Sequence, residues 1–168
     1  GKGYKHLLQP LKQARPDIVL LGGDIFDFTR YHKNTWDFLT QLSKRYAKRI
    51  FMVKGNHEVA KGFTHSEMRR LEQLGIQLVG NKTVNILINQ QYLVLTGLDD
   101  REDWYHTLSD LQRNHTNNEQ AYHILLAHRP SHIKEYLQGN YNLILAGHTH
   151  GGQVRIPYLL NGLYTTDQ

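Results

Sequence analysis

The chain has 168 residues, 39% of them hydrophobic and 21% charged, which is the composition of a single globular domain (residues 1–168) with a core of its own. It contains no cysteine, so disulfide bonds and thiolate ligands are excluded, and any metal must be bound by His, Asp, Glu or Asn. The net charge of +5 suits a phosphate-bearing substrate, nucleic acid or an anionic membrane surface.

The first third of the chain alternates between helical and strand-like patterns. Apolar residues at helical spacing predict two helices, whereas short continuous apolar runs predict strands that are covered on both faces. In chain order we expect a helix over residues 3–14, a strand over 18–21, a helix over 35–47 and a strand over 50–53.

A third helix is predicted to begin after Thr64. Thr64 and Glu67 fit a capping box, and Gly75 fits the C-terminal cap of the same helix. The pattern then changes to apolar residues at positions 84, 86 and 88 that alternate with polar residues at 83, 85 and 89, which indicates a half-buried strand. A polar turn and a second strand over 92–96 complete a predicted hairpin.

The last part of the chain returns to helices and apolar runs. We expect a short helix around residues 108–112, a strand over 123–127, a helix over 131–138, a buried strand over 143–146 and a further strand over 153–156. Helices and strands that alternate at both ends of a hairpin predict α/β layers around at least one sheet.

Four of the predicted buried strands are followed by polar clusters that contain Asp24, Asn56, His128 and His148. In open α/β sheets ligands bind beyond the carboxyl ends of the strands, so we expect these clusters to converge. Asp, Asn and His together suit manganese, iron, zinc or magnesium. Two such cations can share one hydroxide and hold a phosphoryl oxygen, which is the chemistry of phosphate-ester hydrolysis.

The cluster over residues 147–152 is the most informative of the four. His148 and His150 are one residue apart, so in an extended segment their side chains point to the same side. Each of the other clusters has a structural alternative, since Asp24 and Asp27 could cap the next element, Asn56 could form an ordinary turn, and His128 could be a hydrogen-bonded loop histidine. The occurrence of all four clusters after apolar strands favours a metal site.

The clusters in this order resemble the signature of the calcineurin-like metallophosphoesterase superfamily. The matching blocks are G-D-x-x-D at residues 23–27, G-N-H-E at 55–58, the histidine at 128 and G-H-x-H at 147–150. The resemblance implies an α/β/β/α sandwich with mixed sheets. It also implies an enzyme that hydrolyses phosphomonoesters or phosphodiesters through a dinuclear metal centre with a bridging hydroxide.

The same resemblance implies which residues bind metal. Asp24 would bridge two divalent cations, with manganese, iron, zinc and magnesium all open. Asn56, His128 and His148 would complete the second metal site, and His150 would belong to the first. The two histidines of the G-H-x-H block would therefore bind different metals.

Two further residues would act on the substrate. By resemblance His57 binds no metal and protonates the leaving oxygen. Asp27 would pair with His57, orient its ring and raise its pKa, so that the ring stays protonated.

The segment G-H-T-H-G-G-Q at residues 147–153 resembles one bacterial branch of the superfamily. Members of that branch are phosphodiesterases and phosphohydrolases, several of them tethered to membranes and some acting on nucleotide-linked lipids. We therefore expect a bacterial phosphate-ester hydrolase whose full-length form can associate with a membrane through a segment upstream of residue 1. A nucleic-acid partner is disfavoured, because the sequence has no basic stripe interleaved with aromatic residues.

One block of the signature, an N-terminal D-x-H, has no counterpart in the chain. We therefore expect the domain to be truncated at its N-terminus, and also at its C-terminus, where relatives continue with further strands. The alternative is a catalytically impaired metal-binding or scaffold domain, because the first metal site would lack two of its ligands.

Overall fold

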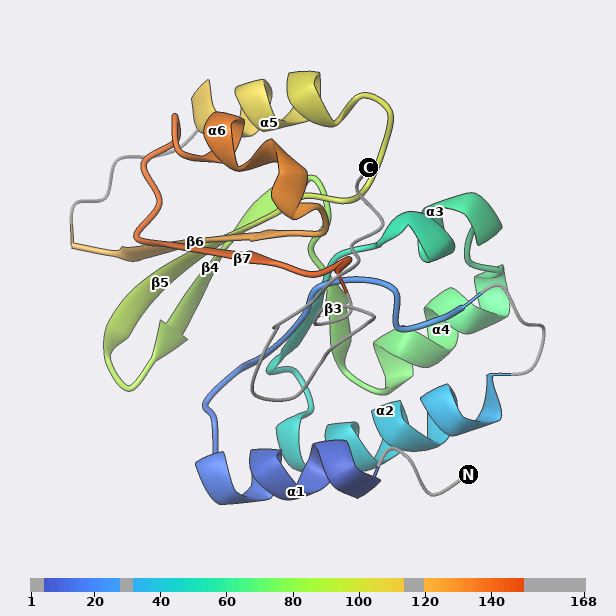
Figure 1. The fold of residues 1–168 in the computed structure, drawn as a ribbon. Coiled ribbons are helices and arrows are strands. Elements are labelled where there is room, and N and C mark those ends of the chain that lie inside the picture. The colour runs from blue at the N-terminus through green and yellow to red at the C-terminus, as the bar shows by residue number, and fades with distance from the viewer. Residues whose placement is uncertain (1–4, 28–31, 114–119, 150–168) are drawn as a thin grey trace, which may run out of the picture.

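Two β-sheets pack face to face in the computed structural model, which describes residues 5–27, 32–113 and 120–149 (Figure 1). The first sheet is entirely parallel and has the order β1-β2-β3. Its strands are β1 (Val19–Leu21), β2 (Ile50–Met52) and β3 (Ile76–Leu78). The helices that accompany it are α1 (Lys5–Ala14), α2 (Lys33–Tyr46), α3 (Asn56–Lys61) and α4 (His65–Gln73).

The second sheet is mixed and has the order β4-β5-β6-β7. An antiparallel hairpin joins its first two strands, and the remaining neighbours are parallel. The strands are β4 (Lys82–Ile88), β5 (Gln91–Gly97), β6 (Tyr122–Ala127) and β7 (Leu143–Ala146). The helices of this half are α5 (Trp104–Arg113), the 3-10 helix η1 (Pro130–His132) and α6 (Ile133–Tyr136).

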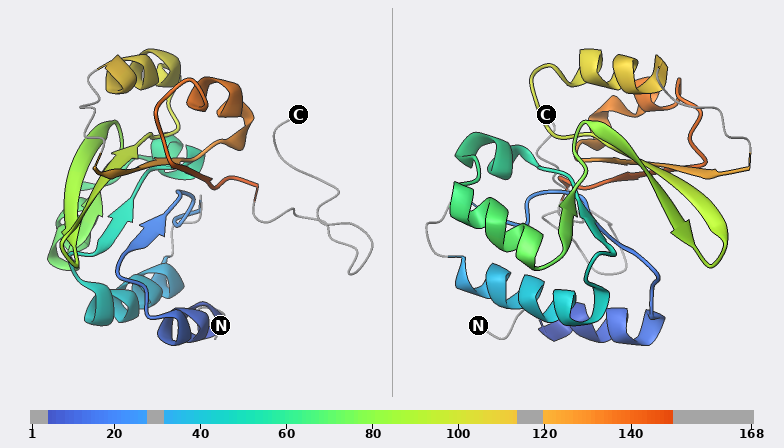
Figure 2. Two further views of the ribbon diagram at one scale, coloured as in Figure 1. Left: turned by 90° about the vertical axis from the view of Figure 1, so that its left-hand side faces the viewer. Right: turned by 180° about the vertical axis from the view of Figure 1, so that it is seen from behind.

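Alternation of side chains along the strands divides the core into three layers. Ile50 and Met52 of β2 pack with the apolar stripe of α2, whereas Phe51 points to the other side and lies between the two sheets. On β6, Leu126 also lies between the sheets, and Leu125 packs against α5 and α6. Figure 2 accordingly shows α5 and α6 on one side of the sheets and α1 and α2 on the opposite side. The predicted α/β/β/α sandwich is confirmed, with one parallel and one mixed sheet.

Most of the predicted elements are present, and the differences have local causes. The capping box of α4 is formed, and Gly75 has a left-handed φ of 67° just after the helix, as its sequence pattern predicts. The patterns missed α3, which has only six residues, and β3, which has three residues with an exposed glutamine in the middle. The helix predicted over 131–138 is shorter and begins as η1.

The prediction that β7 is a buried strand is wrong. Leu143 and Leu145 are 37% and 36% exposed, and only Ile144 packs against the core. In the described ranges β7 is an edge strand of the second sheet and pairs with β6 alone. The strand predicted over 153–156 lies outside the described residues.

No helix in the described ranges is long and apolar enough to cross a lipid bilayer.

Candidate metal centre

The carboxyl ends of β1, β2, β6 and β7 meet at one place, and each is followed by one of the predicted ligands (Figure 1). The backbones of the two sheets touch there, because a Cβ atom on Gly147 would lie 2.5 Å from the carbonyl oxygen of Gly22. The Gly147 N–H also donates to the carbonyl oxygen of His128 at 2.9 Å. The glycines of the motifs therefore let two sheets that are remote in sequence bring their loops into contact.

His128 lies at the centre of this meeting point and is 1% exposed. Its Nδ1 atom lies 2.7 Å from the carbonyl oxygen of Gly22, and because a carbonyl only accepts, Nδ1 carries the proton. Its Nε2 atom lies 3.1 Å from Oδ1 of Asn56, 3.0 Å from Nδ1 of His148 and 3.4 Å from Oδ2 of Asp24. When the ring is neutral, the Nε2 lone pair points at these three atoms, which is the tautomer that metal coordination would require.

Asp24 and His148 both have left-handed backbone conformations, with φ of 54° and 65°. Such angles are unfavourable for residues that have a Cβ atom, although Asp and His adopt them more readily than most. Both residues follow directly after glycines in tight loops. The unusual backbone is concentrated at two of the residues that point into the cluster, as is common at functional sites.

The contact between Asp24 and His128 favours the charged form of each side chain, so a bound cation would take the place of the proton on Nε2 of His128. Burial alone would raise the pKa of Asp24, but hydrogen bonds from His128 and from the backbone N–H of His57 outweigh burial and hold the pKa well below its usual range. Burial alone would lower the pKa of His128, but its contacts with Asp24 and with the Gly22 carbonyl raise it. A positive charge is thus favoured at the point where Asp24 and His128 meet.

The donor set fits a divalent cation. The ligand atoms of Asp24, His128 and His148 all lie within 4.8 Å of one another, and within the described ranges no other group of His, Asp or Glu side chains meets that condition. Asn56 adds an amide oxygen next to His128. One carboxylate, one amide oxygen and two imidazoles form a mixed oxygen and nitrogen set that suits manganese, iron, zinc or magnesium.

Of the other predicted site residues, His57 and Asp27 are not in this group of ligand atoms. His57 lies in the first turn of α3 and is half-buried, and its backbone N–H donates to Oδ1 of Asp24 at 3.1 Å. The Asp27 carboxylate is 60% exposed and lies 3.7 Å from Nδ1 of His32, a buried neighbour that the motifs did not single out. The pairing of Asp27 with His57 stays a prediction. His150 lies outside the described residues.

One residue of the site was given no role by the sequence patterns. Glu58 is fully buried and its carboxylate contacts the loops after both β1 and β2. It stands in the G-N-H-E block, but 34 positions separate it from Asp24. The sequence does hint at one of its contacts, because a glutamate three residues after a helix-capping residue such as Gly55 commonly accepts the backbone N–H of that residue.

A second layer of ion pairs surrounds the site on the side of β5. Asp99 is 4% exposed, accepts the backbone N–H of Lys54 at 2.7 Å and lies 3.4 Å from its ammonium. Asp100 accepts from Nε of Arg129 at 2.9 Å. These contacts fix the residues that directly precede Gly55 and follow His128, so they hold two of the four loops.

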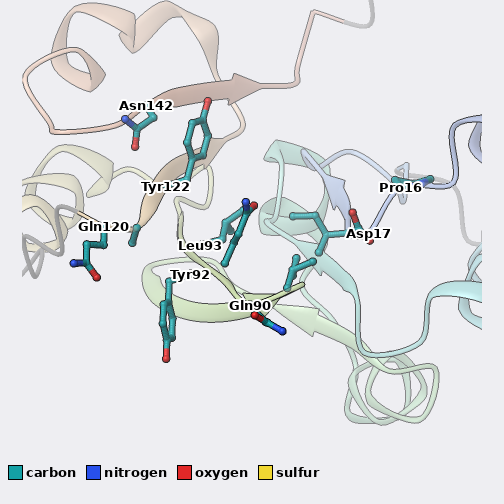
Figure 3. A pocket seen from close by; sticks show the side chains of 12 residues that line it. Pro16, Asp17, Gln90, Tyr92, Leu93, Gln120, Tyr122 and Asn142 are labelled. Carbon is teal, nitrogen blue, oxygen red and sulfur yellow. The ribbon is translucent and has the colours of Figure 1, made fainter.

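A pocket of about 930 Å³ lies at the opposite ends of the strands (Figure 3). It is lined by residues that precede β1 and β7, such as Asp17 and Asn142, and by Tyr92 and Tyr122 at the beginnings of β5 and β6. Because the candidate metal ligands follow the carboxyl ends of strands in the same sheets, this pocket is separate from the candidate centre.

A model of the calcineurin-like phosphoesterase family matches residues 2–152, and the chain belongs to that family. The metallophosphoesterase YkoQ of Bacillus subtilis is 32% identical over 149 residues, covering 87% of this chain and 54% of that protein. Phosphodiesterase YaeI of Escherichia coli is 28% identical over 149 residues, covering 86% of this chain and 53% of that protein. The chain therefore spans about half the length of these curated relatives.

The fold is also that of known structures. The NAD nucleotidase of Haemophilus influenzae superimposes with a TM-score of 0.63 at 17% identity, over 96% of this chain and 35% of the other. At this level of identity the similarity concerns the fold alone.

Proposed function

We propose that the protein is a metal-dependent phosphoesterase whose cation is bound by Asp24, Asn56, His128 and His148. The observation that carries the proposal is the convergence of the other three side chains on Nε2 of His128, at the carboxyl ends of strands from both sheets. Membership of the calcineurin-like phosphoesterase family supports the reaction class. The name of the Escherichia coli relative supports a phosphodiester among the substrates.

The finer proposal is a dinuclear centre in which Asp24 bridges two cations and His150 belongs to the other metal. Two such cations, held by these residues, would lower the pKa of a water that they share, so that it could act as the bridging hydroxide, and would neutralise charge on the phosphoryl oxygens. The chain itself supplies the preorganised ligands, so that no loop has to move as charge develops.

His57 is proposed to protonate the leaving oxygen. Its backbone N–H is anchored on Asp24, so its ring belongs to the same loop as the metal ligands. Asp27 is proposed to orient that ring, and its exposed carboxylate follows Asp24 by three residues in the same loop.

The test uses bis-p-nitrophenyl phosphate and p-nitrophenyl phosphate after chelation and readdition of Mn²⁺. We expect hydrolysis that depends on added metal and is lost in Asp24→Ala and in His148→Ala. The matched control is Asp37→Ala, which removes an exposed carboxylate paired with Lys33 on α2. Unchanged rates in both site variants would overturn the proposal.

The second candidate function is a metal-binding or scaffold domain without turnover. The observation in its favour is that a single group of potential ligands is assembled within the described ranges. Metal content by mass spectrometry separates the candidates: two bound metals with turnover indicate the enzyme, whereas one metal without turnover indicates the scaffold. A nucleotide-linked lipid substrate and membrane association of the full-length protein stay predictions of the resemblance.

A further inference from the structure

Glu58 is the most deeply enclosed charged side chain near the site, with none of its surface exposed. Its Oε2 atom accepts the backbone N–H of Asp24 at 2.8 Å and that of Gly55 at 2.9 Å. Its Oε1 atom accepts the backbone N–H of Phe26 at 2.8 Å. One carboxylate therefore binds three backbone donors that belong to two different loops.

These contacts join the loop after β1, which carries Asp24, to the loop after β2, which carries Asn56. A reciprocal bond runs the other way, because the backbone N–H of His57 donates to Oδ1 of Asp24 at 3.1 Å. The loops are also in backbone contact, since a Cβ atom on Gly23 would lie 2.5 Å from the Gly55 nitrogen. The relative position of the two ligand loops thus depends on hydrogen bonds that converge on Glu58.

One of these hydrogen bonds is made by the backbone N–H of Asp24, whose backbone conformation is strained. Asp24 has a left-handed φ of 54°, a conformation that is held only when its surroundings determine it. Glu58 accepts from the N–H of Asp24 and, two residues on, from that of Phe26, and so fixes both sides of the strained turn. The Phe26 ring is itself fully buried in the first core layer.

We propose that Glu58 is a positioning residue, which holds Asp24 in its left-handed conformation and in register with Asn56 so that the cation site is formed before metal binds. The inference rests on the proposed function, because it takes the Asp24 cluster to be a metal site. Glu58 touches no ligand atom of the cation in this account and acts only through the backbone of Asp24, Phe26 and Gly55.

The chain offers a chemically matched control in Glu67. Glu58 and Glu67 each occupy the third position of a short helix and accept the N–H of the residue that caps it. Glu67 bonds to Thr64, the cap of its own helix, and to Lys61 at the exposed end of α3, and to none of the four candidate metal ligands. The substitutions Glu58→Gln and Glu67→Gln therefore make the same chemical change, but only the first alters contacts with Asp24.

The experiment measures Mn²⁺ affinity by isothermal titration calorimetry in the full chain and in both variants. A glutamine at position 58 keeps one acceptor oxygen and directs an NH₂ group at a backbone N–H, so at least one of the three bonds is lost. We expect Glu58→Gln to weaken Mn²⁺ binding by about tenfold or more, the scale on which outer residues act on metal sites. Glu67→Gln is expected to bind as the parent does.

The outcomes separate this inference from the proposed function. Equal Mn²⁺ affinities in Glu58→Gln and the parent would overturn the positioning role and leave the metal site standing. Equal weakening in Glu58→Gln and Glu67→Gln would also overturn it, since general destabilisation would then explain the loss. A parent chain that binds no Mn²⁺ would overturn both.

A second measurement needs no variant, in case Glu58→Gln fails to fold. Amide hydrogen exchange of the metal-free parent chain reports directly on the N–H groups of Asp24, Phe26 and Gly55. If Glu58 preorganises the site, these amides are protected before metal is added. Rapid exchange that slows only when Mn²⁺ is added would contradict the inference, because the loop would then be ordered by metal.

Discussion

The Nδ1 atom of His128 lies 2.7 Å from the carbonyl oxygen of Gly22, and this contact determines which nitrogen of the ring faces the candidate metal site. Because Gly22 belongs to the first sheet and His128 to the second, the same hydrogen bond also joins the two sheets where their loops meet. A neutral ring held in this way presents its Nε2 lone pair to Asp24, Asn56 and His148.

Substitution of His128 should therefore remove metal binding. We expect His128→Ala to weaken Mn²⁺ binding by more than about tenfold, because even residues outside the ligand shell change affinity by that factor. The control is His123→Ala, which removes another buried histidine from the beginning of the same strand. Calorimetry that finds similar affinities in the two variants would show that His128 is a core histidine and no ligand.

Asp24→Asn tests the charge at the centre of the site. Asparagine tolerates a left-handed backbone and keeps an oxygen that can accept the His57 N–H, so the loop should retain its shape. The loss of the carboxylate charge should lower kcat/KM for bis-p-nitrophenyl phosphate by about a hundredfold or more, as expected when one preorganised electrostatic group is removed.

The control for that variant is Asp37→Asn, whose carboxylate pairs with Lys33 on the exposed face of α2. Its kcat/KM should equal that of the parent protein. If Asp24→Asn also keeps its full rate, Asp24 is no ligand of the catalytic cation.

The contacts of Glu67 predict that the stability of the fold decreases at acid pH, whether or not the candidate site binds metal. Burial would raise the pKa of Glu67, but hydrogen bonds from Lys61 and Thr64 outweigh it and lower the pKa below its ordinary value of 4.5. A carboxyl whose pKa is lower in the folded state contributes stability that is complete above 4.5 and is lost as the pH falls through the folded pKa.

Urea unfolding of Glu67→Gln and the parent chain at stepwise lower pH measures this contribution. The difference in free energy of unfolding should be largest near neutral pH and should shrink as the pH falls below 4.5. A difference that grows in acid would reverse the sign and contradict the contacts assigned to Glu67.

Leu126 and Leu145 allow a comparison of an inner strand with an edge strand of the second sheet. They are partners in the register of β6 and β7, but Leu126 is 2% exposed and Leu145 is 36% exposed. We expect Leu126→Ala to cost about 2 to 5 kcal/mol in the free energy of unfolding and Leu145→Ala clearly less, because removal of a half-exposed side chain leaves no cavity. Equal losses in urea unfolding would show that another part of the protein covers Leu145.

This pair also shows what sequence patterns can and cannot predict. The apolar run over residues 143–146 correctly predicts a strand, but hydrophobicity alone does not say whether a strand is central or at an edge. The hairpin of β4 and β5 and the cap of α4 are specified by neighbouring residues, and both are confirmed.

Some residues of the candidate site could likewise be predicted from the sequence, and others could not. Asp24, Asn56, His128 and His148 each follow an apolar run, so the rule that ligands bind at the carboxyl ends of strands predicts that they converge. Glu58 could not be assigned in this way, because its partners Asp24 and Phe26 are 34 and 32 positions away and become neighbours only through the parallel pairing of β1 and β2. The salt bridge of Asp100 with Arg129 is equally remote in sequence.

The most direct test of the central claim is a crystal structure of the protein soaked with Mn²⁺, with anomalous scattering recorded to locate the metal. We predict an anomalous peak within coordination distance of Asp24, Asn56, His128 and His148, and its loss in His148→Ala crystals. A metal bound elsewhere, or catalytically active crystals with no metal at these four residues, would contradict the account.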